Sequence, residues 1–124
     1  MKQKPEIRVT RNFARDAKPL LKKYPSLDKE LRLLYDELKK NPDLGQPLGN
    51  NAYKIRLAIK SKGKGKSGGA RIITYLETEI IGYFETDKTQ NITVNLITIY
   101  DKSEVCSISL KEIKELIQKI ELIN

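Results

Sequence analysis

Positive charge is concentrated in one segment of the sequence, and this segment holds the residues best suited to chemistry on an anion. Between Asn50 and Leu76 there are seven basic side chains and no Asp or Glu. These side chains are Lys54, Arg56, Lys60, Lys62, Lys64, Lys66 and Arg71. The whole chain has a net charge of +8, from 24 Lys and Arg against 16 Asp and Glu. Such an excess favours a polyanionic partner, which is a nucleic acid, an anionic membrane surface or an acidic protein.

Three of these cations have positions that a β-sheet would fix. From Tyr53 onward apolar and polar residues alternate, which places Lys54 and Arg56 together on the polar face of a strand. Arg71 begins the next predicted strand and can lie beside them across the hairpin. Cations held this close repel one another unless an anion relieves the repulsion. Because Arg and Lys bind phosphate through charge-assisted hydrogen bonds, the trio predicts a phosphate-binding site.

A glycine-rich turn between the two strands carries the other lysines. The glycines of segment 63–69 would let the backbone approach a phosphate chain closely. The predicted RNA-binding residues of this region are Lys60, Lys62, Lys64 and Lys66. The alternative is a solvated lysine loop in which Lys62, Lys64 and Lys66 have no partner. The segment also matches the glycine patterns of dinucleotide-binding and P-loop motifs, but those motifs need a following helix, and a strand is predicted here.

Histidine is absent and cysteine occurs once, as Cys106. An intrachain disulfide, a histidine-based zinc site and an imidazole acid–base pair are therefore excluded, and we expect no metal and no cofactor. Catalysis would have to use Lys, Arg, Tyr, Asp or Glu. The first residues show no signal peptide, and no apolar run approaches the ~18 residues of a membrane span. We expect a cytoplasmic protein without a membrane partner.

The elements that would position the cations follow from the spacing of apolar residues. Strands are predicted at 7–9, 53–60, 71–76 and 92–100, and helices at 13–24, at 27–38 and from 109 onward. Segment 43–51 is predicted as a loop, and segment 77–91 is ambiguous between a strand extension and a polar turn. The order β-α-α-β-β-β-α predicts a single α+β domain over residues 1–124. We expect an antiparallel sheet with an N-terminal helical hairpin and a C-terminal helix.

Helix ends and buried faces can also be predicted. Ser26 is a candidate N-cap for the second helix, and Ser109 with Glu112 forms a capping box for the last one. The apolar stripe of the second helix consists of Leu27, Leu31, Leu34 and Leu38. We interpret this stripe as core, without a functional role.

Three runs of the sequence carry a resemblance when they are taken together. They read Tyr-Lys-Ile-Arg-Leu at 53–57, Gly-Lys-Gly-Lys-Ser-Gly-Gly-Ala-Arg-Ile-Ile at 63–73 and Leu-Ile-Thr-Ile-Tyr-Asp-Lys-Ser-Glu at 96–104. Over roughly residues 6–122 the sequence resembles the RelE/ParE toxin superfamily, and most of all its HigB-like branch of bacterial toxin–antitoxin toxins.

The resemblance implies a RelE-like fold and a ribosome-dependent, metal-independent mRNA endonuclease that inhibits translation. In this reaction a ribose 2′-oxygen attacks the adjacent phosphate in the ribosomal A site. The implied partners are the ribosome with its mRNA and a cognate antitoxin, which is often a helix-turn-helix protein.

The resemblance also implies roles for single residues. The two cations of the family's strand motif match Lys54 and Arg56, its sheet arginine matches Arg71, and its cation after the last strand matches Lys102. RelE carries a tyrosine a few residues beyond that last cation. Segment 106–108 of this sequence has no tyrosine.

The chemistry can be assigned from residue types as well. Arg56 and Arg71 suit stabilisation of the phosphorane oxygens, because a guanidinium fork binds two oxygens at once. Lys54 and Lys102 are candidates for charge stabilisation or proton transfer. Tyr100 and Glu104 are candidates to replace the missing tyrosine, and Tyr100 could also stack on a base. The alternative is that Tyr100 is a sheet-end aromatic and Glu104 a surface acid. Asp101 either ends a strand or orients Lys102.

Two other functions remain open. A ParE-type relative would inhibit DNA gyrase by binding it, although a protein-binding module does not need Arg and Lys clustered on a sheet face. A non-catalytic RNA-binding or ribosome-binding protein is favoured by the lack of a recognisable general base. Platforms for stacking on single-stranded RNA are not obvious, with two Phe and no Trp in the chain.

Overall fold

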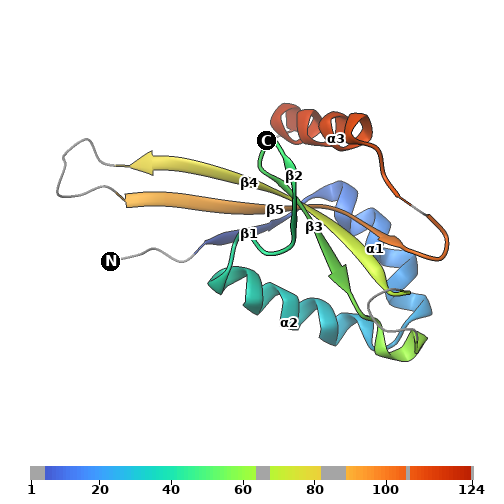
Figure 1. Ribbon diagram of the computed structural model, residues 1–124. Coiled ribbons are helices and arrows are strands. Elements are labelled where there is room, and N and C mark those ends of the chain that lie inside the picture. Colours follow the sequence, from blue (N-terminus) through green and yellow to red (C-terminus); the bar gives the residue numbers. More distant parts are fainter. Residues whose placement is uncertain (1–4, 64–67, 82–88, 106, 124) are drawn as a thin grey trace.

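The computed structural model describes residues 5–63, 68–81, 89–105 and 107–123 of the chain. These residues form an α+β structure in which one five-stranded sheet has helices on both faces (Figure 1). The predicted α+β class is therefore confirmed. The expectation of a purely antiparallel sheet is wrong, because the sheet is mixed.

The strands are β1 (Glu6–Val9), β2 (Gln46–Gly49), β3 (Ala52–Leu57), β4 (Ala70–Ile81) and β5 (Thr89–Asp101). Their order in the sheet is β1-β5-β4-β3-β2. Neighbours from β2 to β5 are antiparallel, because each is joined to the next in sequence by a hairpin connection. β1 pairs with β5 in parallel, and no tight turn links these two strands and forces the opposite direction.

Strand β2 lies inside the segment that we predicted as a loop. Its residues Gln46 and Pro47 pair with Lys54 and Tyr53 of β3. The two strands are joined by Asn50 and Asn51, whose φ angles of 52° and 64° are left-handed, a conformation that asparagine tolerates. Proline and glycine made the segment resemble a loop, but β2 is the last strand of the sheet, and an edge strand accepts a proline without losing a ladder hydrogen bond.

Helices α1 (Arg11–Lys23) and α2 (Leu27–Lys40) cover one face of the sheet, and α3 (Leu110–Ile123) covers the other (Figure 1). Thr10 caps α1, since its Oγ1 accepts a hydrogen bond from the Phe13 amide at 3.2 Å. Ser109 caps α3 in the same way through the Glu112 amide at 3.1 Å, as the sequence predicted. Ser26 stands at the predicted N-cap of α2, but its side chain makes no capping hydrogen bond.

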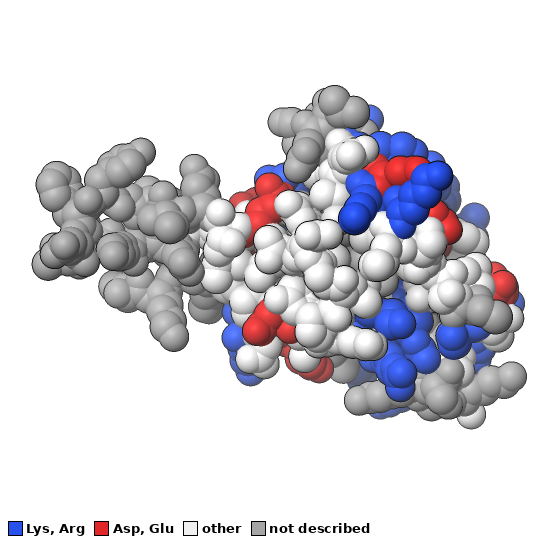
Figure 2. Space-filling model, turned by 45° about the horizontal axis from the view of Figure 1, so that its top comes forward, with Lys and Arg blue, Asp and Glu red and all other residues white. Residues whose placement is uncertain are grey.

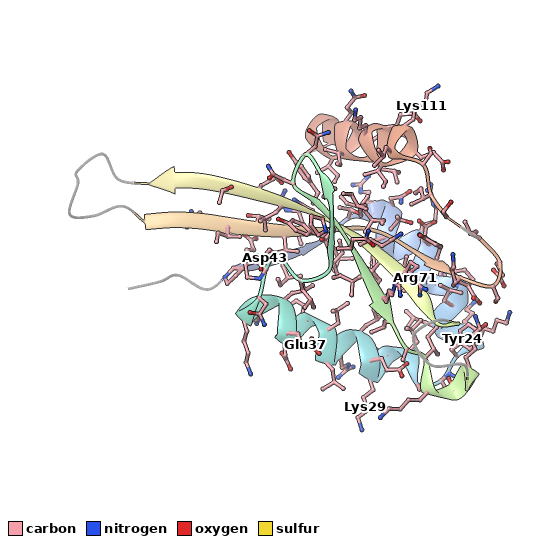
Figure 3. All side chains as sticks on the ribbon, viewed as in Figure 1. Tyr24, Lys29, Glu37, Asp43, Arg71 and Lys111 are labelled. Carbon is pink, nitrogen blue, oxygen red and sulfur yellow. The ribbon has the colours of Figure 1, made fainter. Side chains whose placement is uncertain are left out.

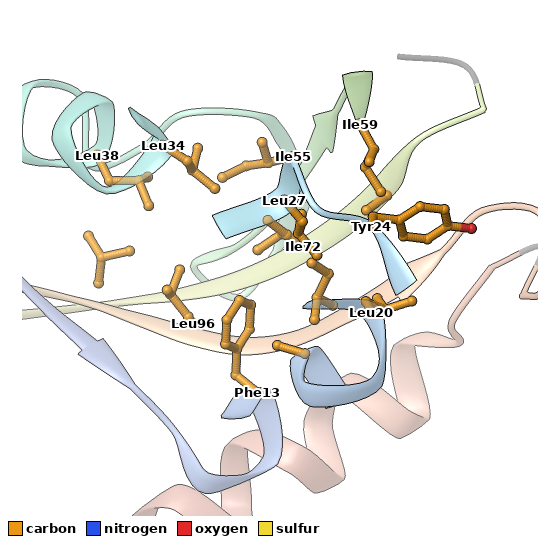
Figure 4. Close-up of a cluster of buried hydrophobic side chains, with 14 residues drawn as sticks. Phe13, Leu20, Tyr24, Leu27, Leu34, Leu38, Ile55, Ile59, Ile72 and Leu96 are labelled. Atoms are coloured by element: carbon orange, nitrogen blue, oxygen red, sulfur yellow. The ribbon is translucent and has the colours of Figure 1, made fainter. Parts of the chain in front are cut away.

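Two apolar layers hold the helices on the sheet. The layer under α1 and α2 contains Phe13, Leu20, Leu27, Leu34, Leu38, Ile55, Ile72 and Leu96 (Figure 4). It includes three of the four leucines of the predicted stripe, and Leu31 packs against it partly buried. The layer under α3 contains Ala52, Ile73, Ile97, Tyr100, Ile113 and Ile120. The sheet is thus anchored from both sides.

A bulge in β5 decides which of its residues face α3. The pairing runs from Ile73↔Thr98 to Thr74↔Leu96 and leaves Ile97 without a partner. Because of this extra residue, Ile97 and Tyr100 both reach the layer under α3 although they are three positions apart.

Among the described residues, no helix combines the length and apolar character that crossing a membrane requires.

We predict that Gly69→Ala destabilises the sheet by roughly 2 kcal/mol, the usual cost of overpacking. A Cβ at this position would lie 2.0 Å from the backbone oxygen of Leu57, so β3 and β4 would have to separate. Urea unfolding measures the change. Gly63→Asn is the control, since that site is open and left-handed with a φ of 76°. Equal stability of Gly69→Ala and the wild-type chain would contradict the close approach.

Candidate nucleic-acid interface

Two arginines and a tyrosine form one row across three strands. The register pairs Arg56 of β3 with Arg71 of β4, and Arg71 with Tyr100 of β5. Side chains of directly paired residues lie on one face with their Cβ atoms about 5 Å apart. Tyr100 belongs to the layer under α3, so the row lies on the α3 face of the sheet. The predicted neighbour relation between Arg56 and Arg71 is confirmed.

Lys54 lies in the adjacent row on the same face. It pairs with Ile73, which belongs to the layer under α3. Lys54 is half-buried and Arg56 is exposed. Neither makes an ion pair with any carboxylate in the described parts of the chain. Two cations are therefore fixed by the sheet with their charge available to an anion.

Arg71 is buried to 5% exposure, although a guanidinium is always charged. Its Nη1 donates a hydrogen bond to the Ala70 carbonyl at 3.2 Å. Figure 3 shows Arg71 near the end of the sheet where Tyr24 also lies. The residue is thus held in one position by the strand and by its surroundings, as a group that orients a phosphate must be.

Tyr100 is buried to 8% exposure beside Arg71. Burial raises the pKa of its phenol, and the positive charge of Arg71 opposes that rise without cancelling it. The hydroxyl therefore stays protonated at neutral pH. Tyr100 is suited to donating a hydrogen bond or a proton and unsuited to removing one.

Lys102 follows β5 and lies beside the beginning of β4. Its backbone amide donates to the Gly69 carbonyl at 3.0 Å, two residues before Arg71. The side chain is half-buried. The structure thus places the Lys102 backbone close to the row of Arg56, Arg71 and Tyr100.

The lysines of the connection between β3 and β4 do not behave alike. Lys60 begins the short 3-10 helix η1 (Lys60–Lys62) and is exposed. Lys62 forms an ion pair with Asp101, and its Nζ also donates to Ser103 Oγ at 2.9 Å. The idea that Lys62 has no partner is therefore wrong. Lys64 and Lys66, and likewise Cys106, lie outside the described residues.

Asp101 is the centre of a buried polar cluster that the sequence did not predict. Besides Lys62, its carboxylate accepts hydrogen bonds from Tyr24 Oη at 2.7 Å and from Ser103 Oγ at 2.7 Å. Burial alone would raise the pKa of the Asp101 carboxyl, but the hydrogen bonds from Lys62, Tyr24 and Ser103 hold it well below its usual range. Asp101 ends β5, as expected. It forms its ion pair with Lys62, whereas the sequence had suggested that it orients Lys102.

A second set of contacts fixes the other end of η1. Glu30 of α2 is buried to 8% exposure, and its Oε2 accepts a hydrogen bond from the Lys60 amide at 2.8 Å. Ser26 Oγ accepts from the Ser61 amide at 2.9 Å. Carboxylates such as Glu30 and Asp101 look like surface acids in a sequence, since Lys60 is 30 positions from Glu30 and Lys62 is 39 positions from Asp101. Together they fix the start of the basic connection.

Glu104 lies apart from the Lys54 and Arg56 side chains. It forms an ion pair of 3.1 Å with Lys23, and both side chains are more than half exposed. Glu104 and Tyr100 line a cleft of about 550 Å³ between α1 and α3. A different cleft of about 470 Å³ at the edge of β3 is lined by Lys54, Arg56 and Lys60, together with the acids Glu30 and Glu37. The predicted catalytic residues are therefore not gathered in one cleft: Lys54 and Arg56 line one, and Tyr100 and Glu104 line another. Arg71 lies between Arg56 and Tyr100 in the sheet register.

Lys and Arg gather in patches on the face shown in Figure 2, with uncharged surface between them. No protein-family model matches the sequence. The resemblance to the RelE/ParE toxins therefore stays a prediction. The function is inferred from the positions of the described side chains.

We predict that Asp101→Asn lowers the free energy of unfolding by roughly 3 kcal/mol at pH 7, because the substitution leaves the Lys62 ammonium buried without its counter-charge. A lowered pKa in the folded state stabilises at pH values above the ordinary carboxyl range and loses this effect as pH falls below about 4. The difference between variant and wild type should therefore shrink in acid, as urea unfolding at pH 7 and pH 3 would show. Asp28→Asn, in an exposed pair with Arg32, is the control and should change stability by less than about 1 kcal/mol.

Proposed function

We propose that this chain is the toxin of a type II toxin–antitoxin system and cuts mRNA on the ribosome as a metal-independent endonuclease. The observation that supports this proposal is the row of Arg56, Arg71 and Tyr100 across three strands, with Lys54 in the next row on the same face. The RelE-like arrangement of the fold is part of the same proposal. A mixed sheet with a helical pair on one face and a C-terminal helix on the other is compatible with it.

The proposed reaction is transesterification within the RNA strand. The ribose 2′-oxygen forms a bond to the adjacent phosphorus while the bond from phosphorus to the 5′-oxygen of the next nucleotide breaks. The 2′-hydroxyl loses a proton and the leaving 5′-oxygen gains one. The products are a 2′,3′-cyclic phosphate and a 5′-hydroxyl.

Charge stabilisation falls to the paired arginines. In the transition state, negative charge collects on the non-bridging oxygens of the phosphorane. Guanidinium groups that are already in position stabilise the negative charge of the transition state more than they stabilise the charge of the ground-state phosphate. Arg71 is the more rigid of the two arginines, because it is buried. Arg56 is exposed, so it can contact the RNA strand of a large substrate.

Proton transfer falls to different groups. Tyr100 is protonated at neutral pH, so it can donate toward the leaving oxygen or toward the phosphate. Glu104 is engaged by Lys23 and lines the cleft away from Lys54 and Arg56, so it is the weaker candidate for the base. Lys54 and Lys102 are the remaining candidates to receive the 2′-hydroxyl proton, and either would do so as the neutral amine.

The partners follow from this activity. The substrate is mRNA in the ribosomal A site, so the protein would act in the cytoplasm. The exposed lysine of η1, Lys60, would contact RNA beyond the scissile phosphate. A cognate antitoxin would be required to keep the producing cell alive.

A second candidate function is binding of RNA or the ribosome without cleavage. It is favoured by a specific observation: Tyr100 stays protonated and Glu104 is paired, so a lysine is the remaining candidate for the base. Reaction of ribosome-bound mRNA separates the two functions. Binding to programmed ribosomes with the mRNA intact would support the second function and contradict the first.

We predict that Arg56→Ala and Arg71→Ala each reduce ribosome-dependent mRNA cleavage by about 100-fold or more and relieve growth arrest, since each removes a positioned donor to the phosphorane. Primer extension on a defined mRNA with purified ribosomes measures cleavage. Lys29→Ala on the exposed surface of α2 removes the same charge and should retain wild-type cleavage.

Folding is controlled separately. Arg56 is exposed, so its replacement should not unfold the chain, and Arg71→Lys keeps the buried charge while removing the planar fork. Wild-type cleavage by both Arg56→Ala and Arg71→Lys would show that this site assignment is wrong. Cleavage by neither the wild type nor any variant, combined with inhibition of gyrase supercoiling, would identify a ParE-type toxin.

A further inference from the structure

A second basic cleft lies at the opposite edge of the sheet. It has a volume of about 690 Å³ and is formed by the end of β1, the start of α1 and the C-terminal half of α3. β1 is an edge strand, with β5 and β4 between it and β3. None of the residues that line this cleft lines the cleft of Lys54 and Arg56. The two basic regions are therefore distinct.

The charges that line this cleft are all of one sign. Four of its lining residues are basic, and none of the described ones is acidic. The basic residues are Arg8, Arg11, Arg15 and Lys119. Arg15 has one loose contact with a carboxylate outside the lining, 3.8 Å from its Nε to Asp16 Oδ1, and its side chain is 75% exposed. Such a contact in solvent neutralises little of the positive charge.

The floor of the cleft is apolar. It consists of Val9, Ile97, Leu116 and Ile120. Val9 is 54% exposed although it is a large apolar residue in a strand. Val9 also borders two further surface depressions on the other side of β1, beside α1 and α2. Apolar surface that continues around a sheet edge and is rimmed by charge is typical of a protein-binding site.

We propose that this cleft binds an acidic, amphipathic peptide segment of a partner protein. The carboxylates of the segment would pair with Arg8, Arg11, Arg15 and Lys119, and its apolar side chains would cover Val9 and Leu116. Arginine forks suit carboxylates, and a basic rim around an apolar floor requires both kinds of side chain in one ligand.

RNA and a second copy of this chain fit the cleft less well. Proteins bind single-stranded RNA by stacking bases on aromatic side chains, and none of the described lining residues is aromatic. A second copy would bring another cluster of cations to the same place, in a chain that already has a net charge of +8. The proposal does not depend on RNA cleavage, because Arg8, Arg11, Arg15 and Lys119 are not among the proposed catalytic residues. Arg15 and Lys119 also border the cleft of Tyr100 and Glu104.

The test uses the full chain and a fluorescein-labelled 16-residue peptide with glutamates and leucines on opposite sides. Fluorescence anisotropy should show saturable binding that weakens with added salt. Arg11→Glu combined with Arg15→Glu should weaken binding at least 10-fold, and Val9→Asn should also weaken it. The matched control is Lys29→Glu with Lys40→Glu, which makes the same charge change on the exposed side of α2 and should bind as the wild type does.

Three outcomes would overturn the proposal. They are absence of peptide binding, equal loss in the control variant, and binding of a 12-nucleotide oligouridine that is as sensitive to Arg11→Glu with Arg15→Glu as peptide binding is. Lys54→Glu with Arg56→Glu locates the peptide: retained binding supports the cleft beside β1, and lost binding places the peptide on the other basic region. Circular dichroism of each variant verifies the fold, since the substituted side chains of α1 and α2 are exposed.

Discussion

β3 and β4 pair Arg56 directly with Arg71, which places both side chains on one face of the sheet. That register is set by the apolar side chains between and beside them: Ile55 and Ile72 are buried under the helical pair, and a slip of one residue would expose both. The positions of the two arginines in the sheet are therefore fixed by core packing, which does not relax when no anion is present. A site held in this way is organised before its ligand arrives, so binding costs less ordering of side chains.

The buried Asp101 carboxylate supports this arrangement from the end of β5. It contacts Tyr24 at the end of α1, Lys62 of η1 and Ser103 of the following turn, while Glu30 and Ser26 hold the other side of η1. The basic connection between β3 and β4 thus starts from a fixed position, although its glycines suggest freedom. The basic residues therefore fall into two groups. Lys62 stabilises the fold through its ion pair with Asp101, whereas Lys54 and Arg56 form no ion pair among the described residues and are available to bind an anion.

The helices and strands in which apolar residues recur at regular spacing could be predicted from the sequence. The helices, the strand with Lys54 and Arg56, and the neighbour relation with Arg71 follow from local spacing. The parallel pairing of β1 with β5 and the ion pair of Lys62 with Asp101 could not be predicted, because the partners are far apart in the sequence. The short β2 strand pairs locally with β3, but Gly45 and Pro47 made its segment resemble a loop. The basic cleft beside β1 was missed because Arg8, Arg11, Arg15 and Lys119 are spread over three elements.

The pairing of β1 with β5 has a consequence for biosynthesis. Thr10, just after β1, is 86 positions from its acceptor Leu96. At a translation speed of about 5–20 residues per second, β1 leaves the ribosome several seconds before its partner strand exists. The β3–β4 hairpin with both arginines has only short-range pairing and can form in that interval. The edge that carries Val9 and Arg8 is then completed last, so nascent chains expose this edge for longer than they expose the arginine pair.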